Sequence, residues 1–211
     1  MLIEWTVVVP FKGTRHAKSR LGDGDNSVLA LAMALDTVEA ALAVTSVIVV
    51  TSAESSAAFA ELGATVVSDA TAGGLIAAIQ LGVAAAAEGT GVAVLLGDLP
   101  ALRPSELAAA LDAAARHPLS IVADADATGT AFVAATPGHS HALAFGPGSR
   151  AAHLAAGYVE LAGDWPGLRR DIDLAEHLAG LDLGPRTAAE LRRIHEGPTP
   201  PVAETGPWRR P

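Results

Sequence analysis

The sequence predicts a single α/β domain in which a mostly parallel, Rossmann-like sheet lies between two layers of helices. Three observations lead to this prediction. Short β-branched runs alternate with longer helical patterns along most of the chain, and such alternation is typical of parallel strands joined by right-handed crossovers. The run 92–96 is apolar throughout, as expected for a central strand that is covered on both faces. The 211 residues are enough for one domain with a sizeable core and too few for two.

The first half of the chain carries the clearest pattern. Val-rich runs predict four strands, at 6–10, 46–50, 65–68 and 92–96. Patterns of helical period lie between them and predict helices at 27–43, 53–62 and 74–88. Ser27 is a candidate N-cap for the first of these helices, and Gly63 follows the second as its expected C-terminal cap.

The second half of the chain predicts shorter elements. Pro104 suits the first turn of a helix over 104–116, which is followed by strands at 119–123 and 131–136. A helix at 149–156 and a strand at 158–161 come next, then helices at 174–181 and 187–195. Thr187 and Glu190 fit a capping box at the start of the last helix. The domain is expected to span residues 1–196, and the Pro-rich segment 197–211 is expected to be a disordered tail.

The composition excludes several classes of function. A formal net charge of −9 argues against a nucleic-acid or membrane-surface binder, since both of those partners are polyanions. The chain has no cysteine, which excludes disulfides, thiolate zinc sites and cysteine nucleophiles. No signal peptide and no apolar run near the roughly 20 residues of a membrane helix is recognised. We therefore expect a cytoplasmic protein.

The loop after the first strand concentrates positive charge. Lys12, Arg15, Lys18 and Arg20 fall within nine residues of an otherwise acidic chain. In a parallel α/β sheet this loop leaves at the carboxyl edge, where ligands bind, so its cations are suited to a triphosphate. A solvated basic loop is the alternative. Neither the ATPase P-loop motif nor the dinucleotide-binding glycine motif is present.

Three aspartates follow strands or lie in extended segments. Asp98 comes directly after the apolar run 92–96, where a carboxylate can hold Mg²⁺ against nucleotide phosphates. Asp171 and Asp173 are two residues apart, so both point to the same side of an extended segment and suit the second half of a metal site. The alternative for Asp98 is a helix cap or a turn aspartate. The alternative for Asp171 and Asp173 is a charged turn that leads into the next helix, with Asp173 as the helix cap.

Two small, hydroxyl-bearing turns, 127–130 and 145–149, can present backbone N–H groups and hydroxyls to a phosphate or carboxylate. Most turns of this composition are only turns. The histidines at positions 117, 139, 141 and 177 are expected to be exposed, because a pair at i and i+2 without a third ligand is an improbable metal site.

Taken in order, these segments resemble those of the guanylyltransferases of deazaflavin coenzyme F(420) biosynthesis, which act on 2-phospho-L-lactate or phosphoenolpyruvate. The resemblance spans residues 6–180 and rests on the ordered set 7–10, 17–21, 97–100, 128–130, 145–149 and 168–173. The chain departs from the family's pattern at Ile76, where asparagine is usual, and at Ala127 and Ala131, where glycine and threonine are common.

The resemblance implies a nucleotide-diphospho-sugar transferase-like fold with a Mg²⁺-dependent active site. By motif match it assigns catalytic roles to Lys18, Asp98 and Asp171. Asp98 and Asp171 are then the metal carboxylates, and Asp173 is an additional metal ligand.

The resemblance also assigns the binding residues. The phosphorylated acid is held by Thr130, Gly146 and Ser149, together with Lys18. The nucleotide is held by Pro10, Lys12, Arg20 and Gly74.

The implied reaction is the transfer of GMP from GTP to phosphoenolpyruvate, with release of pyrophosphate. The product, enolpyruvoyl-2-diphospho-5'-guanosine, would pass to the transferase that attaches the deazaflavin. The same reaction on 2-phospho-L-lactate is the first alternative. A non-catalytic nucleotide-binding module is the second. A molybdopterin guanylyl- or cytidylyltransferase is a further rival, but the Leu-Ala-Gly-Gly loop with which those enzymes begin is missing here.

Overall fold

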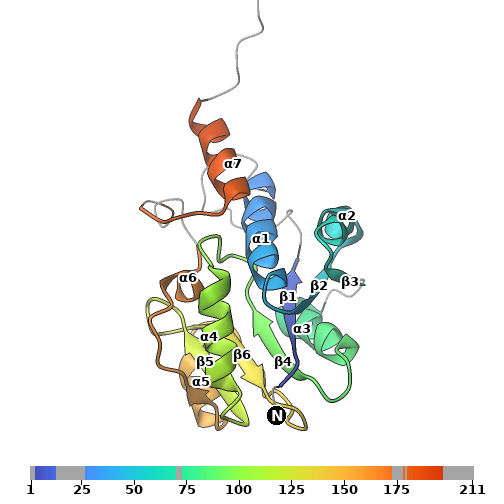
Figure 1. The fold of residues 1–211 in the computed structure, drawn as a ribbon, viewed down its shortest axis with the longest axis vertical. Coiled ribbons are helices and arrows are strands. Elements are labelled where there is room, and N and C mark those ends of the chain that lie inside the picture. The colour runs from blue at the N-terminus through green and yellow to red at the C-terminus, as the bar shows by residue number, and fades with distance from the viewer. Residues whose placement is uncertain (1–2, 13–26, 70–72, 173–177, 179, 197–211) are drawn as a thin grey trace, which may run out of the picture.

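The computed structural model describes residues 3–12, 27–69, 73–172, 178 and 180–196. Its strands form one sheet in the order β3-β2-β1-β4-β6-β5-β7. Among these strands β6 runs antiparallel to both of its neighbours, whereas the other pairs are parallel. The prediction of a single α/β domain with a mostly parallel sheet is therefore confirmed (Figure 1). The strands are β1 (Trp5–Phe11), β2 (Ser46–Thr51), β3 (Thr65–Ser68), β4 (Gly91–Leu95), β5 (Leu119–Ala123), β6 (Thr130–Ala135) and β7 (Val159–Glu160).

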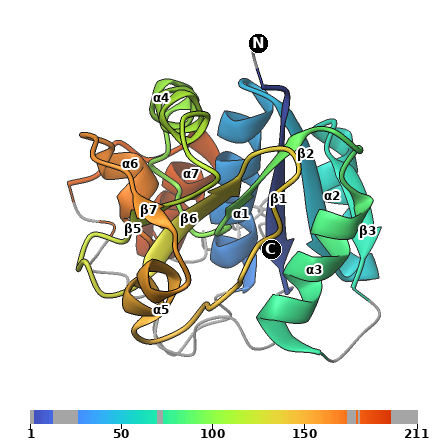
Figure 2. The ribbon, with the colours of Figure 1, turned by 90° about the horizontal axis from the view of Figure 1, so that it is seen from below.

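Helices cover both faces of the sheet. The described helices are α1 (Ser27–Leu42), α2 (Ala53–Glu61), α3 (Gly74–Ala85), α4 (Pro104–Ala114), α5 (Ser149–Ala155), α6 (Pro166–Arg169) and α7 (Pro185–Glu196). Side chains from α1, α2, α4 and α6 pack on one face of the sheet. Side chains from α3 and α5 pack on the other. The sheet is thus the middle of three layers (Figure 2).

The central strands are apolar on both sides because both sides are covered. Val7 and Val9 of β1 belong to the cluster on the α1 face, and Val8 between them belongs to the cluster on the α3 face. This alternation follows from the two-residue period of a strand. Helix α3 lies so close to the sheet that a Cβ on its Gly82 would lie 2.3 Å from Val8 Cγ1. A glycine at this position therefore allows the close packing.

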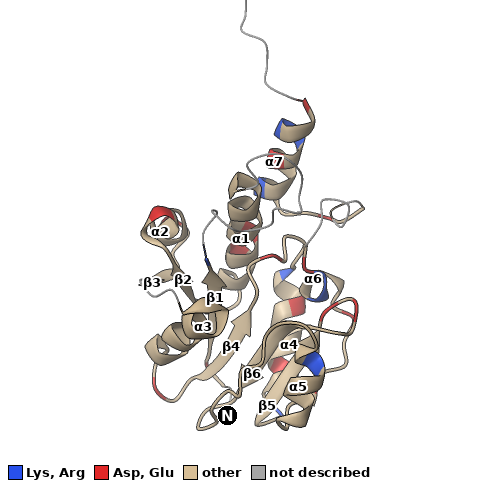
Figure 3. Ribbon diagram, turned by 180° about the vertical axis from the view of Figure 1, so that it is seen from behind, with Lys and Arg blue, Asp and Glu red and all other residues tan. Residues whose placement is uncertain are grey.

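Charged residues lie outside the sheet centre. No Lys, Arg, Asp or Glu occurs in β1 to β6. Figure 3 shows most of the described charged residues on the helices and the connecting loops, and Glu160 lies in the edge strand β7. None of the helices in the described part of the chain is long and apolar enough to cross a bilayer.

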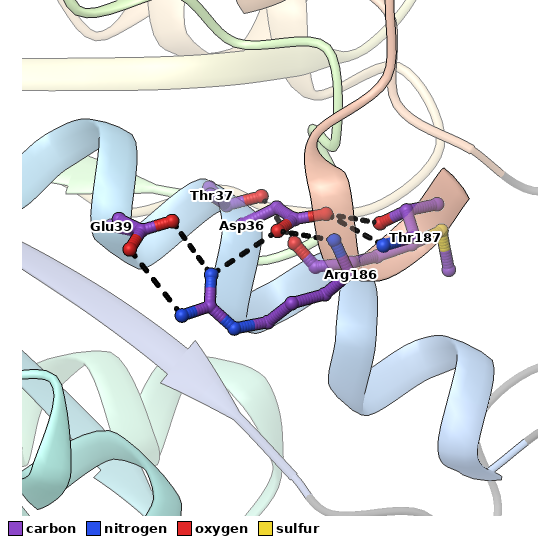
Figure 4. Close-up of polar contacts among 6 residues, drawn as sticks. Asp36, Thr37, Glu39, Arg186 and Thr187 are labelled. Carbon is purple, nitrogen blue, oxygen red and sulfur yellow. Dashed lines mark hydrogen bonds and ion pairs between the residues drawn. The ribbon is translucent and has the colours of Figure 1, made fainter. Parts of the chain in front are cut away.

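Helix α7 is fastened to α1 by a buried carboxylate (Figure 4). Asp36 of α1 accepts hydrogen bonds from the backbone N–H of Thr187 at 2.8 Å and from its hydroxyl at 2.7 Å. The guanidinium of Arg186 lies 3.4 Å from Asp36 Oδ1 and 2.6 Å from Glu39 Oε2. Asp36 therefore satisfies first-turn N–H groups of a helix that begins about 150 residues later in the chain.

The predicted capping box of Thr187 and Glu190 is wrong. Thr187 lies inside α7, which begins at Pro185, and its hydroxyl donates to Asp36. Glu190 accepts a hydrogen bond from Arg193 Nε instead. The N-terminal turn of α7 is capped by Asp36 of α1, whose carboxylate accepts hydrogen bonds from the backbone N–H and the hydroxyl of Thr187. The acceptor therefore comes from another helix and not from a residue of α7 itself.

Most of the other predicted elements that fall in the described residues agree with the structure to within a few residues, with two exceptions. The strand expected at 158–161 is only Val159–Glu160, and the short helix α6 was not predicted. Gly63 has a φ of +95°, as expected for a residue that ends a helix. The helix expected at 174–181 lies mostly outside the described residues, and the tail 197–211 lies wholly outside them. The proposed domain boundary at 196 stays a prediction.

Candidate active site

A cavity of about 480 Å³ opens at the carboxyl edge of the sheet. Its position follows from the topology. The first residue of β6 lies beyond the end of β4 because the two strands are antiparallel, with Leu95 opposite Phe132. The segment after β4 and the turn before β6 therefore meet there. The described lining is Leu75, Leu96, Asp98, Asp124, Thr128, Gly129, Thr130, Phe145, Gly146, Pro147, Gly148, Ser149 and Asp171.

The structure brings Asp98 and Asp171 to this one cavity. The two segments are joined by a backbone hydrogen bond, in which Ile172 N donates to the Asp98 carbonyl at 3.1 Å. Ile172 is fully buried. On the other side of Asp98, the N–H of the buried Leu99 donates to Thr37 Oγ1 at 3.2 Å. Both aspartates are thus anchored through a neighbouring buried residue.

The donor set of the cavity suits a hard divalent cation. Its ionisable lining residues are Asp98, Asp124 and Asp171, and the described lining includes no Lys or Arg. Carboxylate oxygens are the ligands that Mg²⁺ takes in proteins. Among the described residues no group of three or more His, Asp or Glu is arranged as a complete metal site. The third predicted metal ligand, Asp173, lies outside the described residues. Asp98 and Asp171 therefore fit a metal that completes its shell with substrate oxygens and water.

Asp124 shapes one wall of the cavity, and sequence reasoning missed it. Its carboxylate accepts hydrogen bonds from Thr128 N at 3.0 Å and Gly129 N at 2.7 Å. A Cβ on Gly129 would lie 2.2 Å from Asp124 Oδ2, so the turn closes too tightly for a side chain there. Ala127 adopts a φ of +55° in the same turn. No motif in the sequence marked Asp124, because its partners are backbone groups four and five residues away.

The second wall is the turn before α5. Gly146 and Gly148 have φ values of +124° and +74°, a backbone conformation that favours glycine. The turn closes through Ser149 N, which donates to the Gly146 carbonyl at 3.0 Å. This brings Ser149 Oγ to 3.3 Å from Thr130 Oγ1, and both residues are buried. The predicted acid-binding residues Thr130, Gly146 and Ser149 therefore line the same cavity.

The predicted nucleotide-binding residues are less completely described. Gly74 directly precedes Leu75, which lines the cavity, and has a φ of +86°. Pro10 is paired with Val50 in the sheet, and Lys12 is exposed just after β1. Neither Pro10 nor Lys12 belongs to the described lining. Lys18 and Arg20 lie outside the described residues.

The expectation that His117 and His141 are exposed is wrong, whereas His139 is exposed as expected. His117 is partly buried. His141 is also partly buried. Its Nε2 lies 3.0 Å from the Val92 carbonyl and its Nδ1 lies 3.1 Å from the Tyr158 hydroxyl, so both ring nitrogens have a partner inside the protein. Burial lowers the pKa of His141. The remaining predicted histidine, at position 177, lies outside the described residues.

The comparisons with known proteins agree with this architecture. The model of the MobA-like NTP transferase domain matches residues 26–172. A phosphoenolpyruvate guanylyltransferase of Salinispora arenicola is 50% identical over 197 residues, which cover 87% of this chain and 92% of that protein.

Solved structures share the fold at low sequence identity. A protein of Desulfovibrio desulfuricans assigned to the nucleotide-diphospho-sugar transferases has a TM-score of 0.62 at 14% identity, covering 92% of this chain and 96% of that chain. Rv0371c of Mycobacterium tuberculosis, in complex with manganese, has a TM-score of 0.54 at 21% identity, covering 82% and 93%.

The fold predicted from the resemblance, that of the nucleotide-diphospho-sugar transferases, is thereby confirmed. The matched family model covers the segment that carries Asp98, Thr130, Ser149 and Asp171. The curated relative matches nearly the whole chain. The chain is a nucleotidyltransferase of the MobA-like NTP transferase domain family, and it belongs with the phosphoenolpyruvate guanylyltransferases.

Proposed function

We propose that this enzyme transfers GMP from GTP to phosphoenolpyruvate, releasing pyrophosphate and forming enolpyruvoyl-2-diphospho-5'-guanosine. The observation that carries the proposal is that Asp98 and Asp171 line the same cavity as a hydroxyl- and glycine-rich wall. The 50% identity to a phosphoenolpyruvate guanylyltransferase supports the choice of both substrates. 2-Phospho-L-lactate is the alternative acid.

The chemistry is an in-line displacement at phosphorus. A phosphate oxygen of the acid attacks the α-phosphorus of GTP and forms a new P–O bond. The bond from that phosphorus to the bridging oxygen breaks, and pyrophosphate leaves with the electron pair. The acid supplies the nucleophile, so no covalent enzyme intermediate is needed. Positioning of the two reactants and neutralisation of their charge are what the protein contributes.

We assign the charge neutralisation to a bound divalent cation and to Lys18. Asp98 and Asp171 would hold the cation, with Asp173 as a further ligand. Mg²⁺ bound there would offset the negative charge that builds up on the phosphates. The acidic lining of the described cavity supports this assignment. Without a cation, the negatively charged GTP and phosphorylated acid would be repelled by the carboxylates of the cavity. The manganese complex of the structurally similar Rv0371c supports a divalent metal.

We assign recognition of the acid to Thr130, Gly146 and Ser149, and recognition of the nucleotide to Pro10, Lys12, Arg20 and Gly74. We also propose that the enzyme is cytoplasmic and acts in coenzyme F(420) biosynthesis. Its product would then pass to the transferase that attaches the deazaflavin. GTP is expected to be used in preference to ATP, as the resemblance implies.

Pyrophosphate release tests the proposal. Purified enzyme with Mg²⁺ and GTP should release pyrophosphate only when phosphoenolpyruvate is added. ATP in place of GTP, or EDTA added in excess over Mg²⁺, should suppress the release. Release that is independent of the acid would show nucleotide hydrolysis and would contradict the assignment of an acceptor site.

A further inference from the structure

A buried histidine lies directly beneath the hydroxyl wall of the cavity. His153 of α5 has no exposed surface and is not part of the described lining. Its Nδ1 lies 3.1 Å from Thr130 Oγ1, and its Nε2 lies 3.0 Å from the backbone N of Ala144. The rings of Phe145 and Tyr158 pack against it edge-on, with centroids 5.4 and 5.0 Å away. The imidazole is therefore held in one orientation.

The contact with Ala144 determines which ring nitrogen of His153 carries the proton. A backbone N–H can only donate, so Nε2 must accept and cannot be protonated. A neutral imidazole then carries its hydrogen on Nδ1, which donates to Thr130 Oγ1 and also lies against the backbone carbonyl of Ser149. Burial lowers the pKa of His153 and so favours this neutral form.

This tautomer has a consequence for the two hydroxyls above the ring. Thr130 Oγ1 accepts from His153, and Thr130 Oγ1 and Ser149 Oγ share one hydrogen bond at 3.3 Å. Thr130 and Ser149 each have one hydroxyl hydrogen, and only one of these two hydrogens lies in the hydrogen bond between them. Among the described residues neither hydroxyl has another acceptor. One hydrogen is left for an acceptor in the cavity.

The opposite tautomer would remove that donor. If Nδ1 were the unprotonated nitrogen, Thr130 would donate to it and Ser149 would donate to Thr130. Both hydroxyl hydrogens would then be used inside the protein. The state of a residue that does not touch the ligand therefore decides whether the Thr130–Ser149 pair can bind an anion.

We propose that His153 is a positioning residue whose Nδ1–H orients the Thr130–Ser149 pair, so that one hydroxyl donates a hydrogen bond to a carboxylate or phosphate oxygen of the acid substrate. The inference rests on the proposed function, because it takes the ligand of this wall to be a small phosphorylated acid. It adds a residue that none of the sequence motifs identified.

Two substitutions test the roles of the two ring nitrogens of His153 separately. In His153→Asn, the amide nitrogen can take the place of Nδ1 and keep the donor to Thr130. In His153→Gln, the amide oxygen can take the place of Nε2 and keep the acceptor for Ala144, while the donor to Thr130 is lost. At saturating GTP, His153→Gln should raise the KM for phosphoenolpyruvate about tenfold, as expected for one hydrogen bond to a charged group. His153→Asn should restore it to within about threefold of the wild type.

The KM for GTP and a third variant distinguish positioning from general damage. The KM for GTP should stay within about twofold in both His153 variants, since the hydroxyl pair is assigned to the acid. In a Thr130→Val background, His153→Gln should have no further effect, because the hydroxyl that it orients is gone. An unchanged KM for the acid in folded His153→Gln would overturn the inference. Equal rises in the KM for the acid and the KM for GTP, with no recovery in His153→Asn, would also overturn it.

The tautomer can be read directly in the wild-type protein, whatever the variants do. The ¹⁵N shifts of the imidazoles should show His153 protonated at Nδ1. His141 provides the internal control, since its Nε2 lies against the Val92 carbonyl and must be the protonated nitrogen. Protonation of His153 at Nε2 would overturn the inference. Failure of the wild-type enzyme to turn over phosphoenolpyruvate would instead contradict the proposed function, so the two failures are distinguishable.

Discussion

Asp98 and Asp171 are the residues on which the proposed chemistry depends most directly. They are 73 positions apart in the chain, yet a backbone hydrogen bond between Ile172 N and the Asp98 carbonyl joins their segments. Their side chains face the same cavity. The anchoring contacts named above are made by the backbone and by neighbouring buried residues, so an amide of the same size in place of either carboxylate leaves those contacts in place.

Neutral amides at these two positions should therefore abolish activity and spare the fold. We predict that Asp98→Asn and Asp171→Asn each lower kcat by about 10²-fold or more, since each removes a charge that would hold the metal. Steady-state pyrophosphate release measures the effect, and thermal unfolding checks the fold. Asp112→Asn, at an exposed position of α4, is the matched control and should be fully active. Near-normal turnover in a folded Asp98 or Asp171 variant would remove that residue from the metal site.

Gly82 tests the packing of α3 on the sheet. A methyl group there would lie 2.3 Å from Val8 Cγ1 and 2.9 Å from Val50 Cγ2. We predict that Gly82→Ala lowers the free energy of unfolding by about 1–3 kcal/mol, as overpacking does in a dense core. Chemical denaturation measures it. Adding Val8→Ala should recover part of the loss, because it makes room for the new methyl group. Strictly additive losses in the double variant would argue against this clash.

Among the described elements, α7 shows how a distant residue can complete a helix. Asp36 provides acceptors for first-turn groups of α7, and Gly184 leaves the carboxylate room to approach. Within the described part of the chain, the side chain of the exposed Glu39 binds the Arg186 guanidinium, and that hydrogen-bonded ion pair lowers the pKa of Glu39. The buried and the exposed carboxylate should therefore contribute very differently to stability.

We predict that Asp36→Ala lowers the free energy of unfolding by about 2–4 kcal/mol, because it leaves the N–H and hydroxyl of Thr187 without their acceptor. Glu39→Gln is the control and should cost less than about 1 kcal/mol. Thr187→Val should add little to Asp36→Ala, since the partner is already missing. Urea denaturation at neutral pH measures the free energy of unfolding of the wild type, Asp36→Ala, Glu39→Gln and the double variant Asp36→Ala/Thr187→Val. A cost for Glu39→Gln equal to that of Asp36→Ala would contradict the account.

The sequence predicts most elements because their periodicity is local, and it fails where the cause is distant. The central strands are continuous apolar runs, which is why their positions were predicted correctly. The four residues of α6 are too few to show a helical period. The orientation of β6 is not encoded in its apolar pattern. The cap of α7 was misassigned because its acceptor, Asp36, is 151 residues from Thr187.

The same distinction applies to the site. Asp98, Thr130, Ser149 and Asp171 were predicted to act together, and the structure brings them to one cavity. His153 was missed because its contact with Thr130, 23 residues away, is made only in the fold. Asp124 was missed for another reason: its contacts are local, but they are made to backbone N–H groups, which no residue type in the sequence marks.

For the molecule as a whole, the buried histidines make stability depend on pH. Burial lowers the pKa of both His141 and His153 from the ordinary value of 6.5. Below that pH the unfolded chain binds protons that the folded protein resists. Because the unfolded state then binds more protons, the free energy of unfolding rises with pH in this range.

We predict that the contribution of the two neutral histidines to the free energy of unfolding is complete above about pH 6.5. It is lost progressively as the pH falls from there through the lowered pKa values of His141 and His153. Denaturation curves at about pH 7.5 and about pH 5.5 measure the difference, and His153→Asn should reduce it. The ion-paired Glu39 and Glu190 have pKa values below 4.5, so their contribution belongs to a more acidic range. Equal stability at the two pH values would contradict the role of burial.

The mass spectrum of the product tests the central claim most directly. Enzyme, Mg²⁺ and GTP are mixed with equal concentrations of phosphoenolpyruvate and 2-phospho-L-lactate, and the products are identified by mass. We predict a GMP adduct of phosphoenolpyruvate as the main product, formed in equal amount with pyrophosphate. The two acids share a carboxylate and a phosphate and differ by two hydrogens, which make the central carbon planar in one and tetrahedral in the other. A steric difference of this size is worth about 1–3 kcal/mol, so some lactyl product is expected. An excess of the lactyl adduct would contradict the choice of acid, and GDP or GMP without any adduct would contradict guanylyl transfer itself.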